Sequence, residues 1–301
     1  MKIPLALVAL RVALLVVARP AHAQDTARAS TLAGDLRVDT LRSAVFGNAR
    51  AIRVLLPAGY AAPENRGRSY PVLYLNDGQS LFDRATSTFQ PAEWRVDETV
   101  ARLRAEGALP PIVVVGIDHG GRRVREHEYL PWPDAFLEPP DPRPVGARYP
   151  AFVVDEVLPF VESRYRVART RDGRVLGGSS YGALAALYAA AARPGVFRAL
   201  LLESPSLYVA DARVLREVAR ARAVPSRVYL GVGTNELSQP TCTPADGGGE
   251  AVADVRRLAR LLRDRGLTRA AVRVVVEPCA VHHEDAWARR LPGALTFLFA
   301  R

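Results

Sequence analysis

Lysine is nearly absent from this chain, because Lys2 is the only one in 301 residues. Arginine therefore carries almost all of the positive charge, and the formal net charge is +10. A nucleic-acid-binding protein concentrates its basic residues in a patch or stripe that follows the phosphates. The arginines here are scattered along the chain without such a cluster. We therefore expect no nucleic-acid partner.

Long apolar runs are missing after residue 17. The chain begins with a basic residue, an apolar run and a small-x-small site before Gln24, which is the pattern of a secretory signal peptide. Arg11 interrupts the run and leaves an uncleaved anchor as the alternative, although the run is short for a membrane span. We expect residues 1–23 to be removed, no stable membrane span, and export to the periplasm or the extracellular space.

Cysteine occurs only twice, as Cys242 and Cys279. In an exported chain, an even pair of cysteines favours a disulfide. Two free thiols are the alternative.

Recognisable cofactor motifs are also missing. The five histidines and the carboxylates do not fall at H-E-x-x-H or a similar metal-ligand spacing. No G-x-G-x-x-G opens the first strand–helix unit, so a dinucleotide site has no support. We expect neither a metal nor an organic cofactor.

The chain contains short β-branched runs that alternate with longer amphipathic stretches, and this alternation is typical of a mainly parallel sheet with helices on both faces. The fold class is therefore α/β, with a single domain over residues 24–301. The predicted strands are 51–56, 72–75, 112–116, 174–176, 199–202, 227–231 and 272–276. The predicted helices are 93–104, 151–163, 183–192, 212–222, 250–265 and 284–299. Residues 131–150, rich in proline, are predicted to form a surface excursion beside a binding site.

A candidate nucleophile lies where a predicted strand meets an alanine-rich helix. Gly178, Ser180 and Gly182 form a G-x-S-x-G motif there, and such a tight strand-to-helix turn needs small residues. The amide of Tyr181, at the start of the helix, would stabilise a developing oxyanion. Ser179 is the adjacent alternative nucleophile, but it falls outside the glycine frame.

A serine hydroxyl needs a base, and the histidine of a hydrolase triad follows the last strand. His282 and His283 both lie there, after the strand predicted at 272–276. The triad carboxylate is expected on the loop after the preceding strand, where Glu236 comes first. Asp246 and Asp254 follow in the same region and remain alternatives.

The second oxyanion donor normally comes from a backbone amide after an early strand. Here the predicted strand 72–75 leads to Gly78 and Gln79, which could equally form a plain turn. His119, after the strand 112–116, is expected to line a substrate pocket or to be exposed. Trp287, at the head of the last helix, is a second candidate for substrate binding.

Taken together, these segments resemble the esterase family of α/β-hydrolases whose members include esterase D, feruloyl esterases, enterochelin-type siderophore esterases and mycolyltransferases. The resemblance covers most of residues 24–301 and is carried by YPVLYLNDGQSLFD (70–83), VVGIDHGGRRVREHEYLPW (114–132), LGGSSYGALAALY (176–188), YLGVGTNE (229–236) and HHEDAWARRLPGALTFLF (282–299).

The resemblance implies the α/β-hydrolase fold and ester hydrolysis without a cofactor. In such proteins the histidine precedes a tryptophan by five residues, which places the base on His282 and not on His283. The acid position falls on Glu236, where many relatives have aspartate.

The sequence therefore predicts a secreted serine esterase that acts through an acyl-enzyme on a small-molecule or carbohydrate-linked ester. An acyltransferase of the mycolyl type would use the same triad. The non-enzymatic alternative is a hydrolase-fold module that binds a carbohydrate or a siderophore. The acyl group, the alcohol and the oligomeric state are not encoded in any motif of the sequence.

Overall fold

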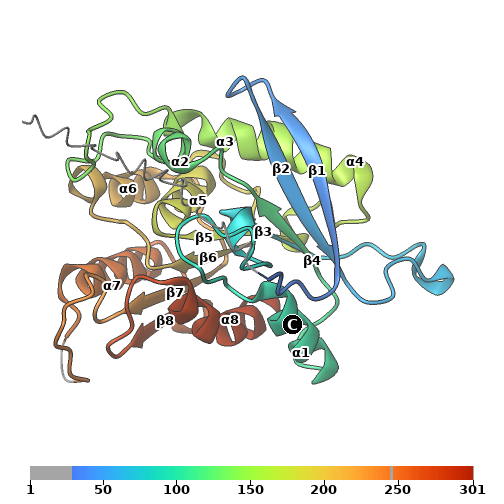
Figure 1. Ribbon diagram of the computed structural model, residues 1–301. Helices are drawn as coiled ribbons and strands as arrows, with labels where there is room; N and C mark the ends of the chain where they lie inside the picture. Colours follow the sequence, from blue (N-terminus) through green and yellow to red (C-terminus); the bar gives the residue numbers. More distant parts are fainter. Residues whose placement is uncertain (1–28, 245–246, 301) are drawn as a thin grey trace, which may run out of the picture.

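A computed structural model describes residues 29–244 and 247–300. Within these ranges the chain forms one sheet of eight strands in the order β1-β2-β4-β3-β5-β6-β7-β8, with helices on both faces (Figure 1). Strands β3 to β8 run parallel, and the pairs β1–β2 and β2–β4 are antiparallel. The strands are β1 (Asp35–Ser43), β2 (Asn48–Leu56), β3 (Val72–Asn76), β4 (Val113–Ile117), β5 (Arg174–Ser179), β6 (Ala199–Glu203), β7 (Arg227–Gly233) and β8 (Val272–Glu277).

The central strands are apolar along nearly their whole length because both faces of the sheet are covered. Every residue of β3, β4 and β6 is buried. A parallel sheet with two covered faces requires such continuous apolar runs. The predicted α/β-hydrolase fold class is therefore confirmed.

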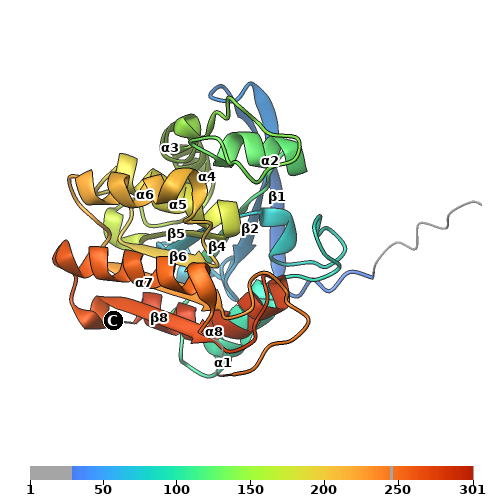
Figure 2. The ribbon, with the colours of Figure 1, turned by 90° about the vertical axis from the view of Figure 1, so that its left-hand side faces the viewer.

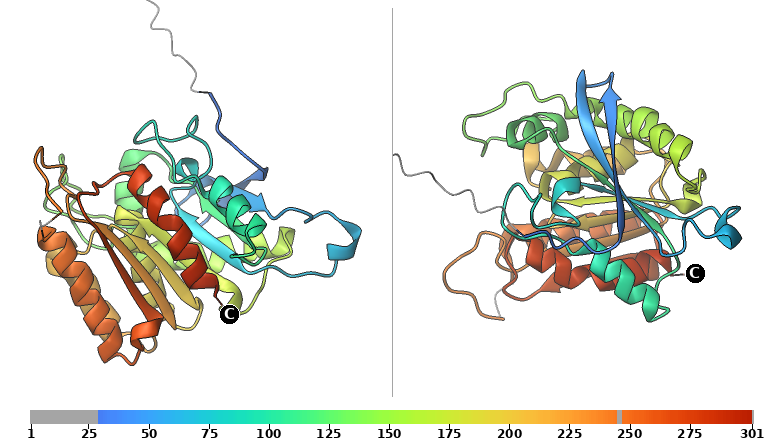
Figure 3. Two further views of the ribbon diagram at one scale, coloured as in Figure 1. Left: turned by 90° about the horizontal axis from the view of Figure 1, so that it is seen from below. Right: turned by 45° about the vertical axis from the view of Figure 1, so that its right-hand side comes forward.

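The helices divide into two layers. Helices α1 and α8 contact each other and share one hydrophobic core with the strands, while α3 to α7 belong to a second core on the opposite face (Figures 1 and 2). Figure 3 shows α8, in red, lying across the sheet near α1. The helices are α1 (Val96–Ala105), α2 (Arg122–Tyr129), α3 (Tyr149–Ala151), α4 (Leu158–Arg164), α5 (Ser180–Ala192), α6 (Val209–Arg220), α7 (Gly249–Asp264) and α8 (Glu284–Phe299).

Strand β1 and helix α2 are not predicted by the sequence pattern. Five of the nine residues of β1 are exposed, since it lies at the sheet edge, and its sequence carries no apolar run. The helix predicted at 151–163 is a longer helical segment, in which the π-helical turn η4 (Phe152–Val157) joins α3 to α4.

The predicted catalytic residues meet at one edge of the sheet. Strands β3, β5, β6, β7 and β8 are parallel, so the loops after them emerge at the same edge. No helix in the described part of the chain is long and apolar enough to cross a membrane. The predicted signal peptide, residues 1–23, lies outside the described residues.

Candidate active site

The turn between β5 and α5 presents Ser180 at the start of a helix. Ser180 has a backbone φ of 56°, which is a left-handed conformation that a non-glycine residue adopts only under strain. A Cβ atom on Gly178 would lie 2.8 Å from the carbonyl carbon of Gly182, so only glycine permits this close approach. The geometry is that of a nucleophile elbow.

The loop after β6 supports Ser180 from one side. The Ser206 amide donates a hydrogen bond to the Ser180 carbonyl oxygen at 3.3 Å. The two hydroxyl oxygens, Ser180 Oγ and Ser206 Oγ, lie 3.5 Å apart.

His282 and Glu236 form a close pair. His282 Nδ1 lies 2.7 Å from Glu236 Oε2. The other carboxylate oxygen, Oε1, accepts hydrogen bonds from the Gly233 amide at 2.6 Å and from Ser204 Oγ at 2.7 Å. Burial alone would raise the pKa of Glu236, but the hydrogen bonds, above all that with His282, outweigh it and lower the pKa. Glu236 is therefore held as a carboxylate against His282.

Trp287 supports this pair from α8. Its indole Nε1 donates a hydrogen bond to Ser204 Oγ at 3.0 Å, and its ring packs edge-on against the His282 ring with centroids 5.3 Å apart. Ser204 thus links the tryptophan to Glu236. No sequence motif marks Ser204.

A cavity of about 240 Å³ lies between the Ser180 turn and the segment that carries His282 and Trp287. Ser180, Tyr181, His282 and Trp287 all line it. Tyr181 is the second residue of α5, and the first amides of a helix have no partner within it. Its amide therefore has no partner within the helix and directly follows Ser180 in the chain.

Gly78 and Gln79 lie in the single helical turn η2 (Gly78–Ser80) after β3. Asp77 and Ser80, which flank them, line the cavity. The Gln79 side chain fixes the turn, because Nε2 donates to the His119 carbonyl oxygen at 3.1 Å and Oε1 accepts from the His119 amide at 3.2 Å. The turn is thus tied to His119, while Gly78 and Gln79 themselves are not among the residues that line the cavity.

His119 lies behind the cavity wall and does not line it. Its ring is buried and packs on Phe89, which does line the cavity, at a centroid distance of 5.2 Å. Burial lowers the pKa of His119 and favours the neutral imidazole.

The cavity lining also includes a buried ion pair that no sequence motif predicts. Arg125 donates to both carboxylate oxygens of Asp77, at 2.7 and 2.8 Å. Such a bidentate pair fixes the loop after β3 to helix α2. Glu284 lines the same cavity, and burial raises its pKa.

Of the two alternative acids, only Asp254 lies within the described residues. Asp254 lies on α7 without a contact to His282, and Asp246 lies outside the described residues.

The predicted disulfide is confirmed: Cys242 and Cys279 are bonded, with a Cα–Cα distance of 5.6 Å. It joins the loop after β7, which carries Glu236, to the segment between β8 and α8, which carries His282. Among residues 29–244 and 247–300, no cluster of three metal-ligand side chains is found.

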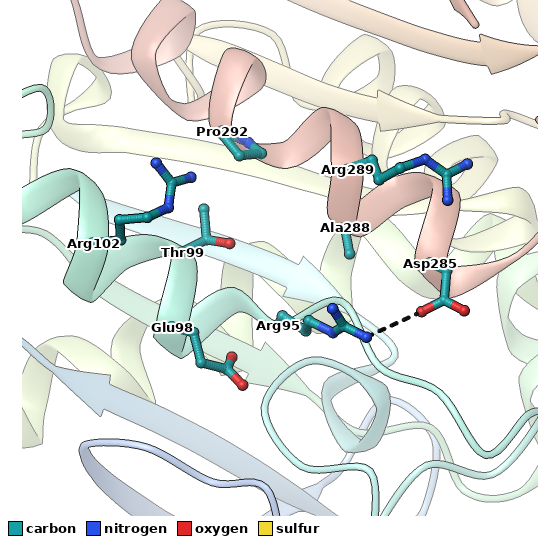
Figure 4. A pocket seen from close by; sticks show the side chains of 8 residues that line it. All are labelled: Arg95, Glu98, Thr99, Arg102, Asp285, Ala288, Arg289 and Pro292. Carbon is teal, nitrogen blue, oxygen red and sulfur yellow. Dashed lines mark ion pairs between the residues drawn. The ribbon is translucent and has the colours of Figure 1, made fainter. Parts of the chain in front are cut away.

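A larger hollow, of about 660 Å³, lies between α1 and α8 (Figure 4). Its arginines have acidic neighbours: Arg95 pairs with Asp285 at 3.6 Å, as drawn, and Arg289 pairs with Glu277 at 2.7 Å. None of the predicted catalytic residues lines this hollow.

Comparison with known proteins identifies the family. Residues 43–298 match the family described as "Putative esterase". The siderophore enterobactin esterase of Emericella nidulans is 35% identical over 164 residues, which are 51% of this chain and 52% of that protein. The uncharacterized protein YbbA of Bacillus subtilis is 23% identical over 254 residues, covering 84% of this chain and 93% of that protein.

Solved structures agree in fold. A ferulic acid esterase superposes with a TM-score of 0.62 at 21% identity, covering 88% of this chain and 98% of that one. The enterochelin esterase of Shigella flexneri gives 0.64 at 18% identity, covering 89% and 60%. With the family match over residues 43–298, the chain belongs to the esterase family of α/β-hydrolases and is a carboxylic ester hydrolase.

Proposed function

We propose that this protein is an exported serine esterase in which Ser180, His282 and Glu236 form the catalytic triad. The observation that carries the proposal is the 2.7 Å contact between His282 and Glu236 beside a cavity that Ser180 also lines. Glu236 holds His282 in the tautomer that carries its proton on Nδ1, which leaves Nε2 free to accept a proton.

The reaction begins when His282 Nε2 accepts the Ser180 hydroxyl proton and Ser180 Oγ attacks the ester carbonyl. The tetrahedral oxyanion is stabilised by the Tyr181 amide and by an amide of the Gly78–Gln79 turn. One such donor contributes roughly 10²–10³-fold in rate. The C–O bond to the alcohol then breaks, and the alcohol leaves with the proton from His282.

Water completes the cycle. It attacks the acyl-enzyme while His282 again accepts a proton, and the acid product leaves as Ser180 regains its hydrogen. Acyl transfer to serine and back requires no redox partner. The relatives named as siderophore and ferulic acid esterases support siderophore-type and aryl esters as the first substrates to screen.

Export is part of the proposal. Residues 1–23 have the sequence pattern of a signal peptide, and the Cys242–Cys279 disulfide forms readily only in an oxidising compartment.

The test is mass spectrometry of the protein after exposure to a fluorophosphonate. We expect one adduct on Ser180, no adduct in Ser180→Ala, and labelling slowed by roughly 100-fold or more in His282→Ala, because the general base is lost. Ser179→Ala is the matched control, since it removes the neighbouring hydroxyl and should label like the wild type. A folded wild-type protein that takes up no label would overturn the triad and favour a binding module.

A further inference from the structure

Two exposed aromatic side chains pack against each other near the Ser180 cavity. Phe136 is 79% exposed and Tyr208 is 41% exposed. Their ring centroids lie 5.6 Å apart in an edge-to-face arrangement. A single exposed apolar side chain needs no explanation, but a packed pair beside a cavity marks a binding surface. We refer to Phe136 and Tyr208 as the aromatic platform.

The platform adjoins the cavity by two routes. Tyr208 OH lies 3.4 Å from Tyr181 OH, and Tyr181 lines the cavity directly after Ser180. Tyr208 also follows Ser206 by two residues, and Ser206 Oγ lies 3.5 Å from Ser180 Oγ. Neither Phe136 nor Tyr208 lines the cavity itself, so the platform adjoins it through Tyr181.

One buried carboxylate fixes the platform. Asp134, which is 2% exposed, accepts hydrogen bonds at Oδ2 from Tyr181 OH at 2.5 Å and from Tyr208 OH at 3.1 Å. Its Oδ1 accepts from the Phe136 amide at 2.9 Å. Asp134 thus fixes the Tyr208 hydroxyl and the Phe136 backbone before a ligand arrives, which lowers the entropy cost of binding.

The chemistry of the platform favours an aryl ligand over a carbohydrate. The Tyr208 hydroxyl already donates to Asp134, and both oxygens of Asp134 already accept. A sugar ring would bring several hydroxyl groups, which on this exposed surface would gain little over the hydrogen bonds that water already supplies. An aryl ring is satisfied by edge and face contacts with other rings.

The size of the cavity indicates why such a subsite is needed. At about 240 Å³, it is smaller than the roughly 300–1,000 Å³ pockets that enclose drug-sized ligands. An ester with a bulky group must therefore extend beyond the cavity and over its rim.

We propose that Phe136 and Tyr208 form a subsite for an aryl group of the ester substrate. This inference rests on the proposed esterase function and adds a recognition element to it. The aryl group could belong to the acyl or to the alcohol part of the ester, and the experiment distinguishes these two sources.

The experiment measures binding without turnover, in the full chain carrying Ser180→Ala. Two pairs of esters are titrated by ligand-observed NMR. Methyl 3-phenylpropanoate and methyl 3-cyclohexylpropanoate carry the ring on the acyl side, whereas benzyl acetate and cyclohexylmethyl acetate carry it on the alcohol side. Each is tested with and without Phe136→Ala, with Phe136→Trp as the conservative variant and Val38→Ala, another exposed apolar position, as the control.

We expect Phe136→Ala to weaken binding of one of the two aryl esters by roughly two- to tenfold, the range of an aromatic pair. Its cyclohexyl partner should change little, Phe136→Trp should restore binding, and Val38→Ala should have no effect. The same loss for aryl and cyclohexyl rings, or no loss for either aryl ester, would overturn the subsite. Turnover of ethyl acetate by the wild type reports separately on the esterase function, so the two failures are distinguishable.

Discussion

At the residue scale, Glu236 shows how a longer side chain serves where the resemblance leads one to expect aspartate. Its extra methylene places the carboxylate among three donors, namely Gly233, Ser204 and His282. The two that bind Oε1 orient the side chain, and Oε2 is left for the histidine. Both carboxylate oxygens of Glu236 therefore have hydrogen-bond partners.

The first prediction concerns Glu236→Gln. The amide oxygen should take the Oε1 position, because two donors point there, so the amide NH₂ would face His282 Nδ1. This favours the wrong imidazole tautomer, and we expect kcat/KM on a reactive ester to fall by roughly 10²–10⁴-fold with little change in melting temperature. Glu236→Asp, which keeps the charge, should retain more activity. Wild-type kinetics in Glu236→Gln would refute the acid assignment.

A second residue-scale prediction concerns the pH dependence of stability. Asp97 is 2% exposed, and burial raises its pKa, although it accepts a hydrogen bond from the Ala33 amide at 2.6 Å. Above the unfolded pKa of about 3.9, the unfolded state releases a proton that the folded state keeps, so this group lowers stability as pH rises. Asp97→Asn does not titrate and still offers an oxygen to Ala33.

The melting temperature of Asp97→Asn relative to wild type should therefore increase between pH 5 and pH 8. The exposed Asp172→Asn is the control and should show no such trend. A difference that stays constant across this range would contradict the role given to burial.

Sequence patterns could predict the proposed triad residues because their order along the chain and their place after strands are constrained by the fold. No sequence pattern predicted Asp134 and Ser204, since they act through hydrogen bonds to residues 32 to 74 positions away. Such contacts depend on how loops pack. His119 was placed beside the right strand, but its burial behind Phe89 depends on a loop whose path no local pattern specifies.

At the element scale, the sequence predicts best those elements whose pattern is set by burial. Helix α8 has the predicted bounds, because its apolar residues recur at helical spacing. Helix α2 was missed because RRVREHEY carries too few apolar residues to show that period; Arg125 is buried there only because Asp77 pairs with it.

The proline-rich excursion, residues 131–150, leads to a prediction about Asp134. Replacing it by alanine removes the acceptor of two tyrosine hydroxyls and of the Phe136 amide. These hydrogen bonds are part-buried and contribute roughly 0.5–1.5 kcal/mol each, so the excursion should open locally when they are lost. Amide hydrogen exchange in residues 131–150 should accelerate in Asp134→Ala. The exposed Glu138→Ala serves as the control, and unchanged protection in Asp134→Ala would show that other contacts hold the excursion.

At the scale of the whole molecule, the near absence of lysine makes the proposed removal of residues 1–23 easy to test. Without them no lysine remains, and the only amine is the new N-terminus. We expect an N-hydroxysuccinimide ester to add at most one group to the secreted protein, measured by intact mass. The Ser180→Ala variant should be used, because a serine esterase would consume the reagent. Two added groups would indicate that Lys2 and the leader are retained.

The Cys242–Cys279 disulfide also bears on how this scaffold could be recombined. The loop that carries Glu236 and the segment that carries His282 are covalently joined, so exchanging either one alone would leave an unpaired cysteine thiol. In a chimera with a relative, the two segments would have to be exchanged together. The excursion with Phe136 and Asp134 has no such covalent tie, but Asp134 binds Tyr181, which follows Ser180, and Tyr208, which precedes α6. A graft of the proposed aryl subsite would therefore have to include both tyrosines.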